Sequence, residues 1–257
     1  MSDGAVRYTV SEGVATVVFV RPEARNALTL AMYDELHRIC ATIASDRSLH
    51  AVVFRGAGDA AFVAGTDISQ FEHFAGAEDG IAYERRIDAT IEMLERLPLP
   101  TIAAVHGVAA GAGLMIATTC DFRFAAPGAQ FGAPIARTVG NCLSMANVAR
   151  LLVAFGAALT RRMLLLAEML TADEVGECGF AELVGGDEMD ARIDGVCRRL
   201  AGSAPLTVRA TREAIRRLTV AALPEGDDLI RLVYGSADFR TGVAAFVAKK
   251  KPAWRGE

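Results

Sequence analysis

Short apolar segments and one helical repeat organise the beginning of the chain. Residues 6–10 and 14–20 predict two strands, and the polar turn between them predicts a hairpin. Apolar residues then recur at three- and four-residue intervals, which predicts an amphipathic helix over roughly residues 29–45. The apolar run at residues 51–54 predicts a buried strand. The chain therefore begins with strands that lead into a helix.

The most informative stretch follows Pro98 and Pro100 and continues to Asp121. Proline cannot continue a helix, so the two prolines end the helix before it. Residues 101–105 are short and apolar, as expected for a strand buried on both faces. A glycine-rich turn and then apolar residues typical of a buried helix follow. This order directs free backbone N–H groups of the helix N-terminus into a cleft, and we predict that the turn forms half of an oxyanion hole.

The remaining pattern completes an α/β chain with a helical end. The polar, glycine-bearing segment 69–80 is predicted to be a mobile lid. Residues 122–126 are predicted as a further strand. Beyond Pro134 the chain is predicted to be mostly helical, with the clearest helices at residues 187–200, 205–218 and 238–250. Strands separated by helices, followed by helices alone, indicate an α/β core with a helical C-terminal part.

Composition narrows the class of protein. A chain of 257 residues can bury a substantial core as one large domain or one domain with an appendage. Hydrophobic residues make up 52%, which is explained either by additional burial in an oligomer interface or by an apolar core alone. The net charge of -4 gives no electrostatic reason to expect nucleic-acid binding.

Other sequence features concern location and metals. The opening residues 1–4 carry no basic or apolar leader, so we expect no secretory signal. Residues 101–120 are long and apolar enough to suggest a membrane span, but their glycines, His106 and the flanking prolines favour a buried strand and helix. The five cysteines and four histidines show no spacing typical of metal ligands. We therefore expect a soluble cytoplasmic protein with reduced thiols and no metal site.

Two Gly-x-Gly motifs raise the question of nucleotide binding. Gly56-Ala57-Gly58 and Gly111-Ala112-Gly113 each follow a predicted strand. A dinucleotide fingerprint needs a third small residue and a later acidic residue. The first motif does not lead directly into a helix, and the second has Ile116 in place of the third glycine. We therefore expect no nicotinamide cofactor.

Several motifs in a fixed order resemble the crotonase, or enoyl-CoA hydratase/isomerase, superfamily. They extend over nearly the whole chain: Pro22 with Asn26-Ala27-Leu28, residues 62–68, Val105-His106-Gly107, Gly111-Ala112-Gly113, Cys120-Asp121, Gln130-Phe131-Gly132, and Phe246 with Lys249-Lys250-Lys251-Pro252. The resemblance implies a crotonase-like spiral of ββα units over residues 1–195 and a helical C-terminal trimerisation region over residues 196–257. It also implies a coenzyme A thioester as substrate, no separate cofactor, and a homotrimer or hexamer.

By position in these motifs, the backbone N–H groups of Ala64 and Ala112 would form the oxyanion hole. Ala112 replaces the glycine that is usual there, and its methyl group would carry a cost if the site required a positive φ. Hydratases that the chain resembles carry two glutamates, at positions that here hold Met115 and Ile135, or Ala136 if the alignment shifts by one. Hydration needs one group to activate water and another to protonate the α-carbon, and these side chains can do neither.

The segment after Pro134 offers other candidates. Arg137, in an otherwise apolar pocket, would attract a substrate carboxylate, a phosphate or an acidic side chain. Asn141 is a candidate for orienting water or a substrate carbonyl, or for capping a helix. Cys142 would gain thiolate character at a helix N-terminus, or is a buried thiol. Glu72 and His73 belong to the predicted lid, where they either enter the site or stay solvated.

The resemblance also assigns residues to the substrate. Coenzyme A recognition would fall to Arg25, to the segment 62–68 and to Lys249-Lys250-Lys251, although those lysines also suit a solvated helix end. The predicted substrate-binding residues are Arg25, Phe62, Gly65, Thr66, Asp67, Ile68, Gly111, Met115 and Ile135, with Asp67 as a local structural group rather than a base. We expect lyase, decarboxylase or isomerase chemistry through a stabilised enolate. A non-catalytic acyl-CoA-binding homologue is the alternative.

Overall fold

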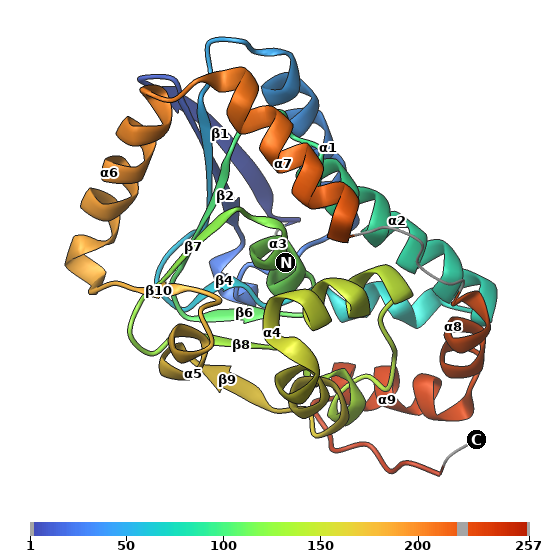
Figure 1. Ribbon diagram of the computed structural model, residues 1–257. Coiled ribbons are helices and arrows are strands. Elements are labelled where there is room, and N and C mark those ends of the chain that lie inside the picture. Colours follow the sequence, from blue (N-terminus) through green and yellow to red (C-terminus); the bar gives the residue numbers. More distant parts are fainter. Residues whose placement is uncertain (1–2, 220–225, 256–257) are drawn as a thin grey trace.

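Two β-sheets and the helices around them position the predicted site (Figure 1). The computed structural model describes residues 3–219 and 226–255. Met1 and Ser2, and residues 220–225, 256 and 257 of the predicted C-terminal region, lie outside the described residues. The first sheet has the order β1-β2-β3-β5-β7-β10 and the second has the order β4-β6-β8-β9.

The strands of the first sheet are β1 (Ala5–Ser11), β2 (Val14–Val20), β3 (Ala51–Gly56), β5 (Thr101–Val105), β7 (Phe122–Ala125) and β10 (Glu182–Leu183). Those of the second sheet are β4 (Ala61–Val63), β6 (Val108–Ala110), β8 (Gln130–Gly132) and β9 (Met169–Thr171). The α-helices are α1 (Leu30–Ser45), α2 (Ala77–Glu95), α3 (Ala112–Thr119), α4 (Met145–Leu165), α5 (Ala172–Glu177), α6 (Met189–Ala201), α7 (Pro205–Thr219), α8 (Asp227–Tyr234) and α9 (Ala237–Val247). Short 3-10 helices are η1 (Pro22–Ala24), η2 (Ile68–His73), η3 (Pro134–Arg137) and η4 (Gly186–Glu188).

Successive pairs of strands build both sheets at once. The segments β3-β4-α2, β5-β6-α3 and β7-β8-α4 each place one strand in the first sheet, the next strand in the second sheet, and then a helix. Corresponding strands pair in parallel, β3 with β5 and β5 with β7 in one sheet, and β4 with β6 and β6 with β8 in the other. This confirms the predicted α/β class and the spiral of ββα units.

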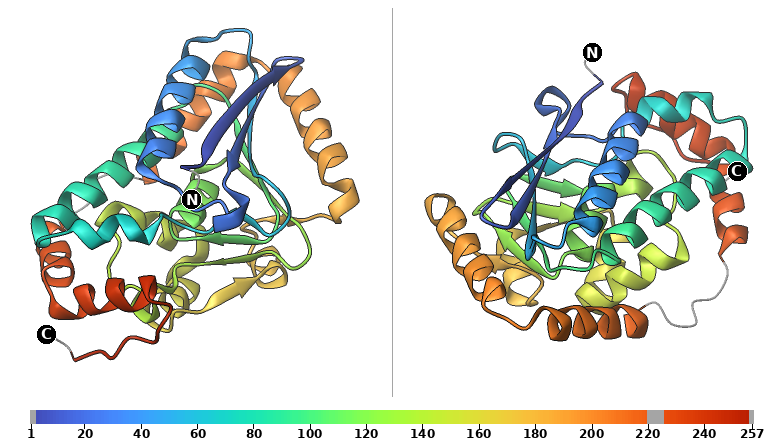
Figure 2. Two further views of the ribbon diagram at one scale, coloured as in Figure 1. Left: turned by 180° about the vertical axis from the view of Figure 1, so that it is seen from behind. Right: turned by 90° about the horizontal axis from the view of Figure 1, so that it is seen from above.

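The strand β5 lies at the centre of the first sheet and is buried along its whole length. Its alternate side chains enter two different cores. Ala103 and Val105 pack with α1, α2 and α3 on one face, while Ile102 and Ala104 pack with α6 on the other. Burial on both faces explains the uninterrupted apolar run of this strand. Figure 2 shows α6 and α1 on opposite sides of the sheet.

Most predicted elements are present, and the differences have local reasons. The hairpin and the helix at residues 29–45 are confirmed as β1, β2 and α1. The strand β6 was not predicted, because its few apolar residues lie between glycines. The segment 69–80 is not an open loop: it contains η2 and the start of α2, and Phe71 is 3% exposed among aromatic rings. The region predicted as mostly helical also contains β9 and β10, which pair at sheet edges.

The described residues contain neither a helix suited to a membrane span nor a cluster of potential metal ligands. No helix between residues 3 and 219 or between residues 226 and 255 is both long and apolar enough to cross a membrane. Within the same residues, no three or more His, Cys, Asp or Glu side chains are grouped as metal ligands would be.

Gly113, at the start of α3, packs directly against the backbone of β4. A Cβ atom at Gly113 would overlap the carbonyl oxygen of Val63. We expect Gly113→Ala to lower the free energy of unfolding by about 3 kcal/mol, because the backbone must move to admit the methyl group. Urea unfolding measures this loss.

Gly76→Ala is the matched control. Gly76 has extended backbone dihedrals, and no described atom lies within 4 Å of the position that a Cβ atom would take there. Gly76 is the N-cap of α2, where alanine is less favourable than glycine, so its substitution should lower the free energy of unfolding by about 1 kcal/mol. Equal losses in the two variants would show that the contact at Val63 is not a steric constraint.

Candidate active site

Two turns that are distant in the sequence touch in the structure. Gly65 follows β4 with a φ of 109°, and Gly111 precedes α3 with a φ of 52°. A Cβ atom at Gly111 would lie 3.6 Å from the Cα atom of Gly65, and a Cβ atom at Gly65 would lie 3.6 Å from the carbonyl oxygen of Ala110. Positive φ angles strain residues that have a side chain, which explains glycine at the two positions. The two glycine turns therefore form one site.

The backbone on either side fixes the first turn. Leu28 pairs with the turn in a parallel bridge, so that the Leu28 N–H donates to Gly65 O at 2.8 Å and the Asp67 N–H donates to Leu28 O at 2.8 Å. Because backbone groups alternate in direction along an extended chain, the N–H of Thr66 points away from Leu28. Within residues 3–219 and 226–255, the Thr66 N–H has no backbone acceptor.

The Ala64 N–H has a different role from the predicted one. It donates to the carbonyl oxygen of Arg25 at 3.1 Å and is therefore already used in the protein. The structure does not support Ala64 as an oxyanion donor. Thr66, two residues further along, is the alternative donor in the first turn, because its N–H has no backbone acceptor among the described residues.

The second turn contains Ala112, the other predicted donor. Ala112 is the first residue of α3, and the first N–H groups of a helix have no acceptor within that helix. Among the described residues, its N–H has no backbone acceptor outside the helix either. The positive φ falls on Gly111, and Ala112 is not among the described residues with positive φ. The methyl group of Ala112 therefore carries no backbone strain.

Two tyrosine hydroxyl groups contact the side chain of Thr66 in the first turn. The Tyr33 hydroxyl and the Tyr83 hydroxyl each lie 2.8 Å from Oγ1 of Thr66. Tyr33 comes from α1 and Tyr83 from α2, so the two helices hold the side chain of Thr66 between them. Neither tyrosine was predicted from the sequence, because only the tertiary arrangement brings these helices to the turn.

Glu84 on α2 is a third residue that was not predicted from the sequence. It is 2% exposed, accepts a hydrogen bond from the Tyr234 hydroxyl at 2.6 Å, and accepts another from the Ser144 N–H at 3.2 Å. Burial raises the pKa of Glu84 to about 8, and Asp88 adds to this, whereas the two hydrogen bonds oppose it. Glu84 lies three residues from Ile81 and from Ile87, on the apolar side of the helix, and this was a signal in the sequence.

Asn141 extends this cluster toward the loop before α4. Its Nδ2 donates to the Tyr234 hydroxyl at 3.2 Å, and α4 is capped by Ser144, so Asn141 is not a helix cap. The Oδ1 atom of Asn141 is buried and has no hydrogen-bond partner within the residues that the structure describes. A buried acceptor without a partner is unusual in proteins and is available to a ligand.

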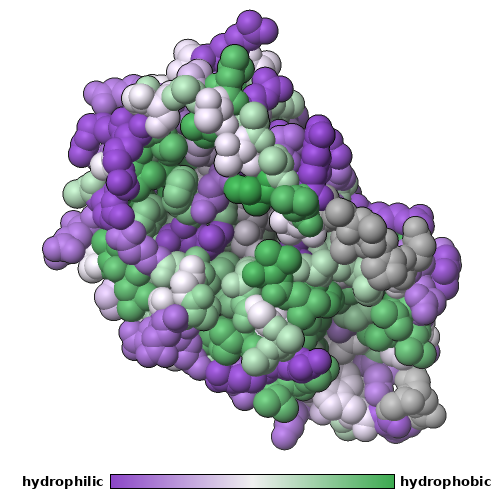
Figure 3. All heavy atoms as spheres, in the orientation of Figure 1, coloured by the Kyte–Doolittle hydropathy of each residue, from purple (hydrophilic) through white to green (hydrophobic). Residues whose placement is uncertain are grey.

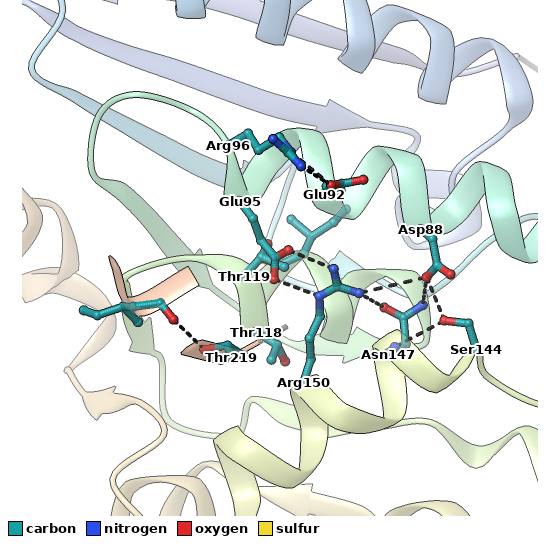
Figure 4. A network of polar contacts seen from close by, with 12 residues as sticks. Asp88, Glu92, Glu95, Arg96, Thr118, Thr119, Ser144, Asn147, Arg150 and Thr219 are labelled. Carbon is teal, nitrogen blue, oxygen red and sulfur yellow. Dashed lines mark hydrogen bonds and ion pairs between the residues drawn. The ribbon is translucent and has the colours of Figure 1, made fainter. Parts of the chain in front are cut away.

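A polar network holds the beginning of α4 against α2 (Figure 4). The guanidinium of Arg150 forms two 2.8 Å hydrogen bonds with Glu95. Asp88 accepts from the Ser144 hydroxyl at 2.7 Å and from Asn147 Nδ2 at 3.0 Å. Because Ser144 also donates its N–H to Glu84, this network fixes one of the hydrogen-bond donors of the buried carboxyl group.

The two residues predicted to stand at the positions of the hydratase glutamates lie in apolar or half-buried surroundings. Met115 is 1% exposed and lies in the main core. Ile135 is half-buried in η3. Ala136 next to it is exposed. Neither of the first two side chains can move a proton.

Other candidates lie outside this arrangement. Arg137 is exposed, so the structure does not place it in an apolar pocket. Burial and the nearby Glu84 raise the pKa of the Cys142 thiol to about 12, which excludes a reactive thiolate at neutral pH. Glu72 and His73 are exposed on η2.

The remaining predicted binding residues have mixed positions. Asp67 forms a 2.8 Å ion pair with the buried Arg21 and caps η2. Although burial acts against it, hydrogen bonds from Ser69 and the pairing with Arg21 hold the pKa of Asp67 below its usual value. This supports the structural role predicted for it. Phe62 packs edge-on against Phe19 in the core. In contrast, Arg25 and the lysines at 249–251 are exposed, and Ile68 packs against the aromatic cluster at η2.

The fold is an α/β spiral in which two glycine turns meet, and the N–H groups of Thr66 and Ala112 in these turns have no backbone acceptor among the described residues. The family model for enoyl-CoA hydratase/isomerase matches residues 9–257. The human mitochondrial enoyl-CoA hydratase domain-containing protein 2 is 30% identical over 255 residues, which cover 96% of this chain and 87% of that protein. A solved enoyl-CoA hydratase/carnithine racemase from Magnetospirillum magneticum is 33% identical, with a TM-score of 0.80 over 100% of this chain and 97% of that one.

The chain belongs to the enoyl-CoA hydratase/isomerase family, within the crotonase superfamily. A solved methylmalonyl-CoA decarboxylase in complex with 2-nitronate-propionyl-CoA has a TM-score of 0.90 over 98% of each chain. At 23% identity, this likeness shows the shared fold alone. The family match over residues 9–257 confirms the predicted superfamily.

Glu84 should make stability depend on pH. Its pKa in the folded protein is raised from 4.5 to about 8, so between these values the folded state keeps a proton that the unfolded state has lost. Its contribution to the free energy of unfolding therefore falls as the pH rises from 4.5 to 8, by on the order of 4 kcal/mol. We expect Glu84→Gln to remove this part of the pH dependence.

The measurement is the difference in unfolding free energy between pH 5 and pH 8.5, taken from urea titrations of each protein. Glu92→Gln is the matched control, since Glu92 lies on the same helix and is exposed. It should follow the wild type. If Glu84→Gln and the wild type lose equal stability over this range, Glu84 does not retain its proton on folding.

Proposed function

We propose that this protein acts on an acyl-CoA thioester by stabilising an enolate between the N–H groups of Thr66 and Ala112. The observation that carries the proposal is that the two glycine turns meet and leave these two donors without a backbone acceptor among the described residues. Negative charge develops on the thioester oxygen when the α-carbon loses a proton or a carboxylate. Two preorganised donors, one at a helix N-terminus, stabilise that charge by about 3 kcal/mol each.

The reaction we propose is lyase or decarboxylase chemistry rather than simple hydration. Hydration requires water activation and protonation of the α-carbon, and the apolar Met115 and Ile135 occupy the positions of the two hydratase glutamates. Decarboxylation forms the enolate by loss of CO₂ and needs no general base. The unpartnered Oδ1 of Asn141 and the exposed Arg25 are our candidates for substrate contacts, and no separate cofactor is required.

A second candidate is an isomerase. An isomerase must take a proton from one carbon and return it to another, and the buried Glu84 is a carboxyl group with a pKa near the working range of such a base. A non-catalytic acyl-CoA-binding homologue is the third hypothesis. It is supported by the apolar Met115 and Ile135 at the predicted positions of the two glutamates.

A single set of assays separates these readings. With purified protein, we expect CO₂ release from methylmalonyl-CoA and little or no hydration of crotonyl-CoA, since Met115 and Ile135 cannot activate water. Isomerisation of 3-butenoyl-CoA to crotonyl-CoA measures the second candidate. Direct binding of the same thioesters is measured by calorimetry in parallel.

Fast hydration of crotonyl-CoA would contradict the argument from Met115 and Ile135. Tight binding without turnover of any of the three thioesters would identify a binding protein. Absence of both binding and turnover would contradict the proposal for the paired amides.

We also propose that the chain forms a homotrimer or a hexamer. Apolar side chains are exposed over α4 and α7, which Figure 3 shows on one face of the molecule. They are Leu152, Val153, Leu165, Leu166, Leu206, Ile215 and Leu218. Such clusters mark protein contacts rather than free surface.

Substituting two of these side chains tests the oligomer. Ile215→Glu with Leu218→Glu should lower the mass found by sedimentation equilibrium from three or six chains to one. Arg209→Glu is the control, because it adds the same charge at an exposed polar position of α7. A wild-type protein that sediments as a monomer would contradict this proposal.

A further inference from the structure

The hydroxyl groups beside the first turn form a row with a defined centre. Thr66 Oγ1 lies 2.8 Å from the hydroxyl oxygen of Tyr33 and 2.8 Å from that of Tyr83. The same threonine carries one of the two N–H groups proposed to bind the thioester oxygen. Thr66 therefore connects the proposed oxyanion pair with a source of exchangeable protons.

Burial determines the direction in which this row donates. Three hydroxyls have three hydrogens, and the two hydrogen bonds use two of them. Tyr33 is 1% exposed, and an unused buried donor is costly. The arrangement that leaves no buried donor unused has Tyr33 donating to Thr66 and Thr66 donating to Tyr83. The hydrogen of Tyr83 is then the one available outside the row.

The position of Tyr83 suits a proton donor. It is half-buried and lies one hydrogen bond away from the residue whose N–H would hold the carbonyl oxygen. The α-carbon of a thioester is bonded directly to the carbonyl carbon. It would therefore lie close to Thr66 when the Thr66 N–H holds the carbonyl oxygen. Burial, together with Tyr33 and Glu84, raises the pKa of Tyr83 well above its usual value. The phenol therefore keeps its proton at neutral pH.

We propose that Tyr83 is the catalytic residue that protonates the α-carbon of the enolate, with Thr66 and Tyr33 as its positioning residues. This inference rests on the proposed function. In decarboxylation, the C–C bond to the carboxylate breaks, CO₂ leaves, and the electron pair enters the enolate. The α-carbon then takes the Tyr83 proton and the thioester carbonyl re-forms. The Tyr83 phenolate, stabilised by the hydrogen bond from Thr66, takes a proton from water.

A donor fixed on one face of the enolate makes protonation stereospecific, and this provides the test. Wild-type protein with methylmalonyl-CoA in D₂O should give propionyl-CoA with deuterium in one configuration at the α-carbon. Tyr83→Phe should lower kcat about 100-fold or more, because a positioned acid is lost. Its product should carry deuterium in both configurations, because water then protonates both faces. The dissociation constant for propionyl-CoA should stay within twofold.

Two further variants separate the chemical role from packing. Tyr8→Phe removes a phenol hydroxyl from β1, outside the site, and should match the wild type in rate and configuration. Tyr33→Phe removes the far end of the row and should slow turnover less than Tyr83→Phe does, with a single configuration kept. Equal scrambling by Tyr33→Phe would overturn the assignment of the donor to Tyr83.

The inference and the proposed function fail in different ways. If Tyr83→Phe keeps the wild-type rate and a single configuration while the wild type decarboxylates the substrate, the inference is wrong and the proposed function stands. If the wild type neither binds nor decarboxylates the thioester, the proposed function is wrong, and the role of Tyr83 is overturned with it.

Discussion

The contact between the two glycine turns is the constraint on which the rest of the site depends. Gly113 brings the start of α3 against the carbonyl of Val63, and Gly111 brings the same helix against Gly65. Any side chain at Gly113 would separate the strand β4 from the helix. This contact brings together the turns that contain Ala112 and Thr66, although the two residues belong to different ββα units. The proposed pairing of their N–H groups thus depends on close packing.

The helix α2 connects this pair of donors with the remaining polar groups. The Tyr83 hydroxyl forms a hydrogen bond with Thr66. The neighbouring Glu84 accepts hydrogen bonds from Tyr234 at the end of α8 and from Ser144, the N-cap of α4. A buried carboxyl group costs stability unless it is hydrogen-bonded or neutral, and Glu84 is both hydrogen-bonded and raised in pKa. Retaining such a group beside the site is consistent with a functional demand rather than with stability.

The sequence predicted the elements whose burial is continuous or periodic, and missed what depends on tertiary pairing. The strand β5 and the helix α1 follow directly from apolar patterns, and Ala112 follows from its place at a helix N-terminus. The choice between Ala64 and Thr66 could not be made, because it depends on which backbone groups pair with Leu28. Tyr83 carries no sequence signal, since its partner Thr66 lies 17 residues away in the turn before α2 and no spacing pattern connects the two. Glu84 did carry a sequence signal, because it is an acidic residue on the apolar side of a helix.

The most direct test of the paired donors is the infrared stretching frequency of a bound thioester carbonyl. Propionyl-CoA labelled with ¹³C at the carbonyl is measured free and bound to wild type, Ala112→Pro and Ala112→Gly. Proline is tolerated at the first helical position and removes only the N–H, whereas glycine keeps it. Two donors predict a lower frequency in the wild type and the glycine variant, and a smaller shift in the proline variant. A bound wild-type carbonyl with the frequency it has in water would contradict the oxyanion site.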